Sequence, residues 1–287
     1  MPLKQNIADI ILIGLQLRDL EMNLMELKEL CEKIDLPSEA KKAVLEISLN
    51  LPKTPLLKTI TDPKTAKSSY LELKKLCSYE SGFTMLAYML TAALNTYDLY
   101  VKKSIDNKIF FDTMECFSRF VGEHKASFGC YGFDRAWWTY RQLSMTLFRI
   151  GELEYEFRDD EKTIHIHIPT RANIDLNSCR ESYEVMQNFV REHYSDKSEY
   201  KMVLNSWLLS PALDKLLDSE SNIIKFKNCF DIQSFDSEAK EFLQWVYGKM
   251  DIEYSNLPEY TSLQKNMKKF LLNGGTVGSA KGTLIKF

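Results

Sequence analysis

The chain has 287 residues, a length that suits two domains of ordinary size. Hydrophobic residues make up 45% of it and charged residues 27%, a globular composition that excludes disordered and fibrous classes. The formal net charge is -3, and basic residues are gathered in neither half, so we expect no nucleic-acid partner.

Cysteine spacing and hydropathy favour a cytoplasmic protein. The six cysteines are scattered, with no CxxC pair and no zinc-binding spacing, which is typical of reduced and mostly buried thiols. Beyond the N-terminal region, the most apolar stretch is residues 85–94, which is much shorter than the ~20 residues of a membrane span. No cleavage pattern of a signal peptide follows the apolar run at residues 10–15. We therefore expect a cytoplasmic location and no membrane association.

The first part of the chain is predicted to be entirely helical. Apolar residues recur at three- and four-residue spacing over residues 7–34, which is typical of one long amphipathic helix packed into its own core. Further helices are predicted over residues 38–49, 64–77, 83–102 and 108–123. This region carries no catalytic motif, and we expect two domains, 1–128 and 129–287.

The pattern after Gly129 is that of a mixed α and β domain. Two strands, 151–157 and 163–168, alternate apolar and polar residues. The other predicted elements are helix 137–148, helix 175–194, strand 202–209, helix 210–217, strand 223–232, helices 237–247 and 262–272, and a final strand pair with a glycine-rich hairpin turn at 274–282. The predicted fold class is α+β (mixed α/β), an all-helical domain followed by one with a mixed, mainly antiparallel sheet flanked by helices.

Glutamates and histidines share one face of the hairpin formed by the first two predicted strands. With residues 158–161 as the loop, Glu154 lies opposite His165 and Glu152 opposite His167; a slip by two residues keeps the faces and changes the partners. Such pairs are either ordinary cross-strand stabilisers or a base for proton transfer. Two histidines at this spacing also suit a metal, but no further histidine is near in sequence, and no metal is expected.

Two other groups are candidate ligand contacts. The densest aromatic cluster comprises Trp137, Trp138, Tyr140 and Arg141. An arginine beside aromatic rings builds either a recognition pocket or a packed joint between domains. The polar residues around the end of strand 202–209 are Asn205, Ser206 and Ser210. Polar groups at strand ends often face a ligand, although a serine followed by proline also suits a helix N-cap.

Long blocks of the second half resemble a known family. They are YGFDRAWWTYRQLSMTLFRIGELEYEF from residue 131, then HIHIP, then NSWLLSPALDKLL with SNIIKF, then LPEYTSLQKNMKKFLLNGGTVGSAKG. They resemble the GNAT-like C-terminal domain of a bacterial acyltransferase domain-containing family, which also carries a helical N-acyltransferase N-terminal domain. The resemblance covers most of residues 130–287.

The resemblance implies transfer of an acyl group from acetyl-CoA or another acyl-CoA to an amine on a small molecule or peptide. In such enzymes the thioester lies along a splayed central strand, here 163–169, and its pyrophosphate binds backbone N–H groups of the next loop, here 170–177. The candidate residues on this mapping are Ile166, Ile168, Arg171, Ala172, Asn173, Asn205 and Ser206 for the cofactor, Trp138, Arg141, Ser210 and Asn222 for the substrate, and Glu154, His165, Glu152 and His167 for catalysis. Glu154 with His165 is the first choice for the base.

The sequence departs from the general GNAT pattern in two places. Loop 170–177 lacks the glycines that let backbone approach a phosphate closely, and Arg171 offers charge instead. The stretch after strand 202–209 lacks the tyrosine that protonates the leaving thiolate; Asn222 and Phe226 stand in that region. A second hypothesis follows, a GNAT-like domain that has lost catalysis and serves as a binding or regulatory module.

Overall fold

The computed structural model describes residues 24–77 and 81–285, in a chain that divides into two compact units, Met1–Phe148 and Arg149–Phe287. Of the helix predicted at 7–34, residues 24–33 are described and are helical, and the rest lies outside the described residues. We expected the boundary after residue 128. The division lies later because helix α8 (Ala136–Leu143) packs against the preceding helices of the first unit.

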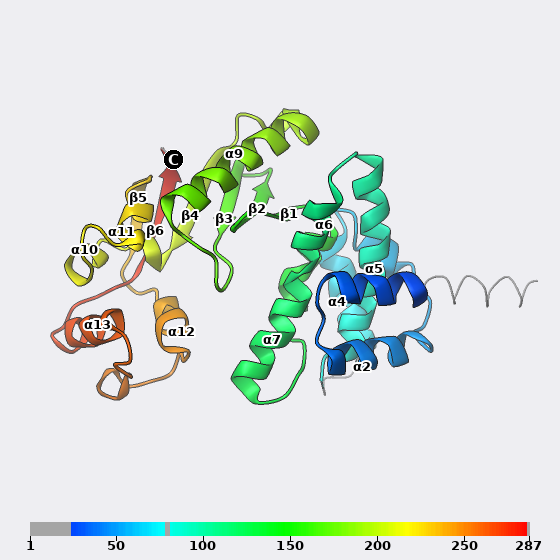
Figure 1. Ribbon diagram of the computed structural model, residues 1–287, viewed down its shortest axis with the longest axis horizontal. Helices are drawn as coiled ribbons and strands as arrows, with labels where there is room; N and C mark the ends of the chain where they lie inside the picture. Colours follow the sequence, from blue (N-terminus) through cyan, green and yellow to red (C-terminus); the bar gives the residue numbers. More distant parts are fainter. Residues whose placement is uncertain (1–23, 78–80, 286–287) are drawn as a thin grey trace, which may run out of the picture. The chain divides into compact units, whose positions relative to one another are not determined.

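The first unit is helical throughout its described residues up to α8, as predicted. Its helices besides residues 24–33 and α8 are α2 (Ser38–Ser48), α3 (Leu56–Thr59), α4 (Ala66–Leu76), α5 (Phe83–Lys102), α6 (Asn107–Met114) and α7 (Cys116–Phe128) (Figure 1). The predicted helix 108–123 is thus interrupted, at Glu115. The most apolar helix, α5, buries residues on several sides, and its Thr96 hydroxyl donates to the Leu143 carbonyl of α8 at 2.8 Å.

The second unit is built on a six-stranded sheet in the order β1-β2-β3-β4-β6-β5 (Figure 1). The strands are β1 (Leu147–Ile150), β2 (Leu153–Arg158), β3 (Thr163–His167), β4 (Lys201–Ser206), β5 (Phe230–Asp236) and β6 (Ser279–Leu284). β2 and β3 form an antiparallel hairpin, β3 and β4 are parallel, and β6 is antiparallel to β4 and β5. The predicted fold class is confirmed.

Helix α9 (Leu176–His193) connects the parallel strands β3 and β4, as a crossover between parallel neighbours must. It buries one apolar stripe that includes Tyr183, Met186 and Phe189. A hydrogen bond of 2.8 Å between the hydroxyls of Tyr155 on β2 and Ser182 on α9 joins helix to sheet. Because side chains alternate along a strand, the residues on the other face of β2 and β3 are the polar ones.

A second core of the unit lies among four short helices, α10 (Leu213–Leu216), α11 (Asn222–Lys227), α12 (Glu241–Tyr247) and α13 (Ser262–Leu272). It includes Trp207, Phe242, Met267 and Val277, each at least nine-tenths buried. Helix α13 begins at Ser262 as predicted, because Thr261 and Gln264 form a capping box there.

Several predicted elements differ in the structure, among them strand 202–209, which ends at Ser206, and helices 210–217 and 237–247, which are the shorter α10 and α12. The strand expected at 223–232 is α11 in its first half, because the Ser221 hydroxyl accepts the Ile224 N–H and so opens a helix. The helix expected at 137–148 ends at Leu143, and β1 follows it. The hairpin expected at the end of the chain is the single strand β6, whose partners β4 and β5 lie far away in sequence.

No helix within residues 24–77 and 81–285 combines the length and the apolar character needed to cross a membrane.

Candidate functional site

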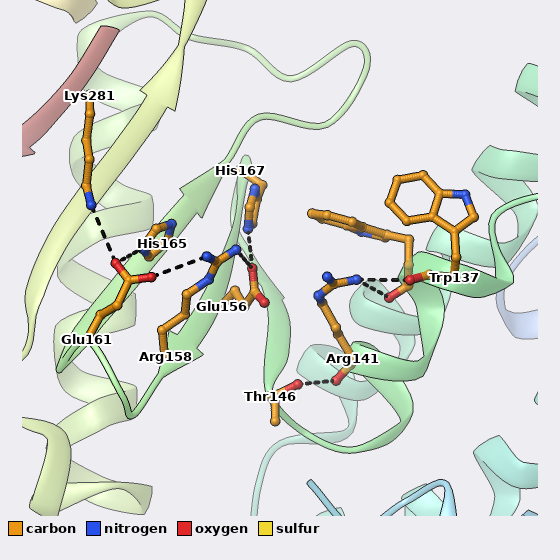
Figure 2. Close-up of polar contacts among 10 residues, drawn as sticks. Trp137, Arg141, Thr146, Glu156, Arg158, Glu161, His165, His167 and Lys281 are labelled. Carbon is orange, nitrogen blue, oxygen red and sulfur yellow. Dashed lines mark hydrogen bonds and ion pairs between the residues drawn. The ribbon is translucent and has the colours of Figure 1, made fainter. Parts of the chain in front are cut away.

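The polar face of the β2–β3 hairpin gathers glutamate, arginine and histidine side chains (Figure 2). The predicted register is wrong by two residues. Glu154 lies opposite His167 and Glu156 opposite His165, because pairing begins at Arg158 with Thr163 and the loop is 159–162. Lys162 closes that loop with a φ of 51°. A slip of two residues keeps the same faces, so the expected face is correct while its partners are not.

Ion pairs connect this face into one chain. The Glu156 carboxylate contacts His167 Nε2 at 2.9 Å and accepts a hydrogen bond from Arg158 at 3.1 Å. Arg158 also donates to Glu161 at 3.4 Å, and Glu161 contacts His165 Nε2 at 3.3 Å. Carboxylates therefore alternate with basic side chains along the chain, which suits groups that are partly withdrawn from water.

A residue of another strand completes the chain. Lys281 of β6 donates to the Glu161 carboxylate at 3.4 Å, although β4 lies between β3 and β6 in the sheet (Figure 2). Glu161 belongs to the hairpin loop and is exposed, so its side chain folds back over the polar face of the sheet. Sequence reasoning did not identify Glu156, Arg158, Glu161 or Lys281 as members of this group. Period-two alternation over residues 151–157 indicated the face of Glu156, whereas Arg158 was expected in the loop and no local signal linked Glu161 to Lys281.

Several side chains of this cluster are withdrawn from water. Glu154, Glu156 and His165 are 4%, 7% and 8% exposed. Burial lowers the pKa of His165 below its ordinary value, and the positive charge of Arg158 lowers it further, so the ring is neutral near pH 7. At Glu161 desolvation acts to raise the pKa, but hydrogen bonds and charges of His165 and Lys281 outweigh it and hold the pKa below its ordinary value.

The two parallel strands part at their carboxyl ends. Their pairing runs only from Thr163 with Lys201 to His165 with Val203, although both strands continue. The residues expected to hold the cofactor along these strands flank the unpaired stretch: Ile166, Ile168, Asn205 and Ser206. Backbone groups at such an opening are available for pairing with an extended ligand. The structure thus brings these four residues to one opening, beside His167.

Several backbone N–H groups in and just after the loop that follows β3 already donate hydrogen bonds to carboxylates of the protein. The Asn173 N–H donates to Glu152 at 2.9 Å, so Glu152 lies at this loop instead of opposite His167. The N–H groups of Asn177 and Ser178 donate to the Asp175 carboxylate at 2.9 and 3.0 Å. These backbone bonds and the Ser178 hydroxyl hold the pKa of Asp175 below its ordinary value. Two carboxylates therefore sit where the sequence predicts a pyrophosphate.

Ala172 and Arg171 are the two other loop residues that were predicted to bind the cofactor. The Ala172 N–H donates to the Pro169 carbonyl at 3.1 Å, which closes a tight turn. Arg171 is exposed and has a φ of 68°, in the region that favours glycine. Its guanidinium remains a charge that a phosphate can approach.

The four residues expected in the substrate pocket have separate surroundings. Within the first unit, the Arg141 guanidinium lies 4.5 Å from the centre of the Trp138 ring and donates to the Trp137 carbonyl at 3.1 Å (Figure 2). In the second unit, Ser210 is fully buried, and its hydroxyl donates to the Val277 carbonyl and accepts the Ala212 N–H. That hydroxyl therefore ties two backbone segments together. Asn222 is the exposed first residue of α11.

The described residues contain no group of three or more His, Cys, Asp or Glu side chains placed to hold a metal ion. The cluster on the hairpin instead pairs each carboxylate with basic groups. Side chains of these types are suited to ion pairing and to proton transfer.

Two family models match the chain almost end to end. Residues 25–145 match the N-acyltransferase N-terminal domain, and residues 147–284 match the GNAT-like C-terminal domain. No curated protein matches the sequence.

Solved structures that are similar to this one include acyltransferases. One is an acyltransferase in complex with decanoyl-CoA and teicoplanin, at 17% identity and a TM-score of 0.74, covering 91% of this chain and 87% of that one. Another is an acyltransferase mutant in complex with octanoyl-CoA, at 17% identity and a TM-score of 0.74, covering 91% and 88%. The fold is therefore shared over both units, and the chain belongs to the acyltransferase family that joins an N-acyltransferase N-terminal domain to a GNAT-like C-terminal domain.

Proposed function

We propose that this protein transfers an acyl group from an acyl-CoA thioester to an amine. The observation that carries the proposal is the opening between β3 and β4, which lies directly beside the His167–Glu156 pair. The amine nitrogen attacks the thioester carbonyl, a C–N bond forms and the C–S bond breaks. A base removes the proton of the amine, and the CoA thiolate leaves and takes up a proton.

The opening suits the pantetheine arm of CoA. This arm is extended and contains two amide groups, which can pair with strand backbone as an added strand does. Ile166 and Ile168 offer backbone on one side, and Asn205 and Ser206 on the other. The phosphates would follow at loop 170–177, where Arg171 supplies charge, once the carboxylates of Glu152 and Asp175 give up their backbone donors.

His167 is the residue best placed to act as the base. Its Nε2 faces Glu156, a contact that favours a proton on Nε2 and leaves Nδ1 as the basic atom of the ring. Glu156 is largely buried and accepts a hydrogen bond from Arg158. These contacts fix the carboxylate, which in turn orients the His167 ring. Glu154, our first choice from sequence, lies directly across from His167 and is buried. It would contribute to the negative field that favours an ammonium acceptor.

The solved relatives suggest which ligands to use first. Their complexes contain decanoyl-CoA, octanoyl-CoA and teicoplanin, so medium-chain acyl-CoA donors and amines on small molecules or peptides are the substrates to test. We place the activity in the cytoplasm, where acyl-CoA is made. All six cysteines lie in the described part of the chain, and none of them forms a disulfide, as suits a reducing compartment.

The proposal is tested by calorimetry followed by turnover. Decanoyl-CoA, octanoyl-CoA and acetyl-CoA are titrated into the full chain, and release of the CoA thiol is then measured with a panel of amines. Saturable binding and amine-dependent thiol release are the expected results. Absence of binding to all three thioesters would exclude the proposal.

One observation favours the second candidate, a binding module without catalysis. The Asn173, Asn177 and Ser178 N–H groups already donate to Glu152 and Asp175, so a pyrophosphate would have to displace these two carboxylates. In that case acyl-CoA or the amine would bind without any thiol release. The two measurements above therefore separate the two candidates.

A further inference from the structure

Three basic side chains from different strands converge on one carboxylate. Arg158 of β2, His165 of β3 and Lys281 of β6 lie 3.4, 3.3 and 3.4 Å from Glu161. Figure 2 shows all three pointing to this side chain from the polar face of the sheet. Such convergence of donors is what an anion-binding site requires.

The carboxylate in the centre comes from an exposed loop, while the donors come from the sheet. Glu161 is one of four residues that connect β2 to β3, and its side chain is 36% exposed. The side chain of His165 is only 11% exposed, and the side chains of Arg158 and Lys281 are 34% and 38% exposed. Donors anchored on the sheet thus hold a carboxylate that a small movement of the loop would withdraw.

We propose that Arg158, His165 and Lys281 form a binding site for a carboxylate of the acceptor substrate, and that Glu161 occupies this site as an internal stand-in. The inference rests on the proposed acyl transfer, which requires an amine acceptor. Neutral His165 donates through Nε2, and the two cations supply charge. Glu156 shares Arg158, so the site keeps a net positive charge when Glu161 leaves.

The position of the site on β3 defines the acceptor. His165 and His167 lie on the same face, two residues apart, which places them ~7 Å from each other along the strand. In an acceptor whose amine lies at His167 and whose carboxylate binds at His165, the two groups are only a few bonds apart. Amino acids and dipeptides have this arrangement.

The same geometry separates this site from the phosphates of CoA. Loop 170–177 follows the carboxyl end of β3, whereas Arg158 and Glu161 lie at its amino end. A CoA molecule that runs along the opening between β3 and β4 therefore directs its phosphates away from Arg158 and Glu161, while Lys281, which pairs with Asn205 of β4, reaches Glu161 from the level of the opening. The anion belongs to the acceptor in this arrangement.

The test is a binding measurement that needs no acyl transfer. Acetate is titrated at pH 7 into the full chain, and the ring resonances of His165 are followed by NMR. The Glu161→Gln variant removes the competing negative charge, so it should bind acetate about fivefold more tightly than the wild type, the factor expected for one partly exposed ion pair. Adding Lys281→Gln should remove this gain. Adding Lys162→Gln instead, at an exposed lysine of the same loop, should leave the gain in place.

Three results would overturn the proposal. They are an absence of saturable shifts at His165 in Glu161→Gln, equal acetate binding with and without Lys281, and displacement of acetate from His165 by adenosine 3′,5′-bisphosphate, which would assign the site to CoA. A failure of the proposed function would show as absent thiol release and leave the acetate titration unchanged. The two failures are therefore distinguishable.

Discussion

His167 and Glu156 are joined by a contact of 2.9 Å between Nε2 and a carboxylate oxygen, although the residue directly opposite His167 is Glu154. The contact is diagonal across the hairpin, over a separation that long side chains can span. Arg158 donates a hydrogen bond of 3.1 Å to the same carboxylate, so two contacts fix the position of the Glu156 side chain. Two buried carboxylates, Glu154 and Glu156, thus surround one histidine at the point where β3 and β4 part.

The first prediction concerns His167 as the base. His167→Gln should lower kcat by about 10²- to 10⁴-fold, the usual contribution of general base catalysis, and leave the affinity for decanoyl-CoA unchanged. The rate of thiol release and calorimetric binding are the two measurements. His193→Gln is the matched control, because His193 also contacts a glutamate but lies at the end of α9. A rate for His167→Gln equal to that of the control would remove His167 from this role.

The second prediction concerns the protonation of His165. Burial, followed by the charge of Arg158, lowers its pKa, so NMR titration should give a midpoint below 6.5. Arg158→Gln removes one of the lowering charges and should move the midpoint upward. A midpoint at or above 6.5 in the wild type would contradict the burial of this ring.

The sign of the linked stability follows from the same shift. A histidine whose pKa is lowered on folding binds its proton more weakly in the folded state, so stability is complete above pH 6.5 and falls as the pH decreases toward the folded pKa. His165→Gln should flatten this part of the curve in urea unfolding at successive pH values. Glu161 and Asp175 have lowered pKa values, and their contributions are lost only at more acidic pH, as the pH falls through those values.

The third prediction concerns the bond between Tyr155 and Ser182. Both residues are buried, and the Ser182 hydroxyl also contacts the Ile150 carbonyl. Ser182→Ala should lower the free energy of unfolding by roughly 1–3 kcal/mol, because it leaves buried polar groups without a partner. Combining it with Tyr155→Phe should cost less than the sum of the two single changes, as measured by urea unfolding. Strict additivity would mean that the two hydroxyls do not interact.

The fourth prediction concerns Glu152 at loop 170–177. If a pyrophosphate binds there, the carboxylate on the Asn173 N–H repels it. Glu152→Gln should therefore strengthen decanoyl-CoA binding by about two- to fivefold, the effect of roughly 0.5–1 kcal/mol from one nearby like charge in water. Calorimetry measures it, with Glu184→Gln, an exposed glutamate of α9, as the control. Weaker binding, or an equal gain in the control, would place the phosphates elsewhere.

The sequence alone determined the elements whose formation depends on local periodicity and caps. The bounds predicted for α5 and α13 are those observed, because the apolar spacing of α5 and the capping box of Thr261 and Gln264 at α13 are both local features of the chain. The faces of β2 and β3 were also predictable, since alternation has a period of two whatever the register. The family resemblance in the second half was confirmed over residues 147–284.

Only the tertiary structure decided which residues of that polar face meet. A hairpin register depends on where its loop closes, and a slip of two residues keeps every apolar side chain buried, so hydrophobicity cannot choose between the two registers. The contact between Glu161 and Lys281 arises because β6 inserts between β4 and β5, a pairing of segments far apart in the chain. The sequence therefore determined the chemistry of the face, and long-range strand pairing decided its partners.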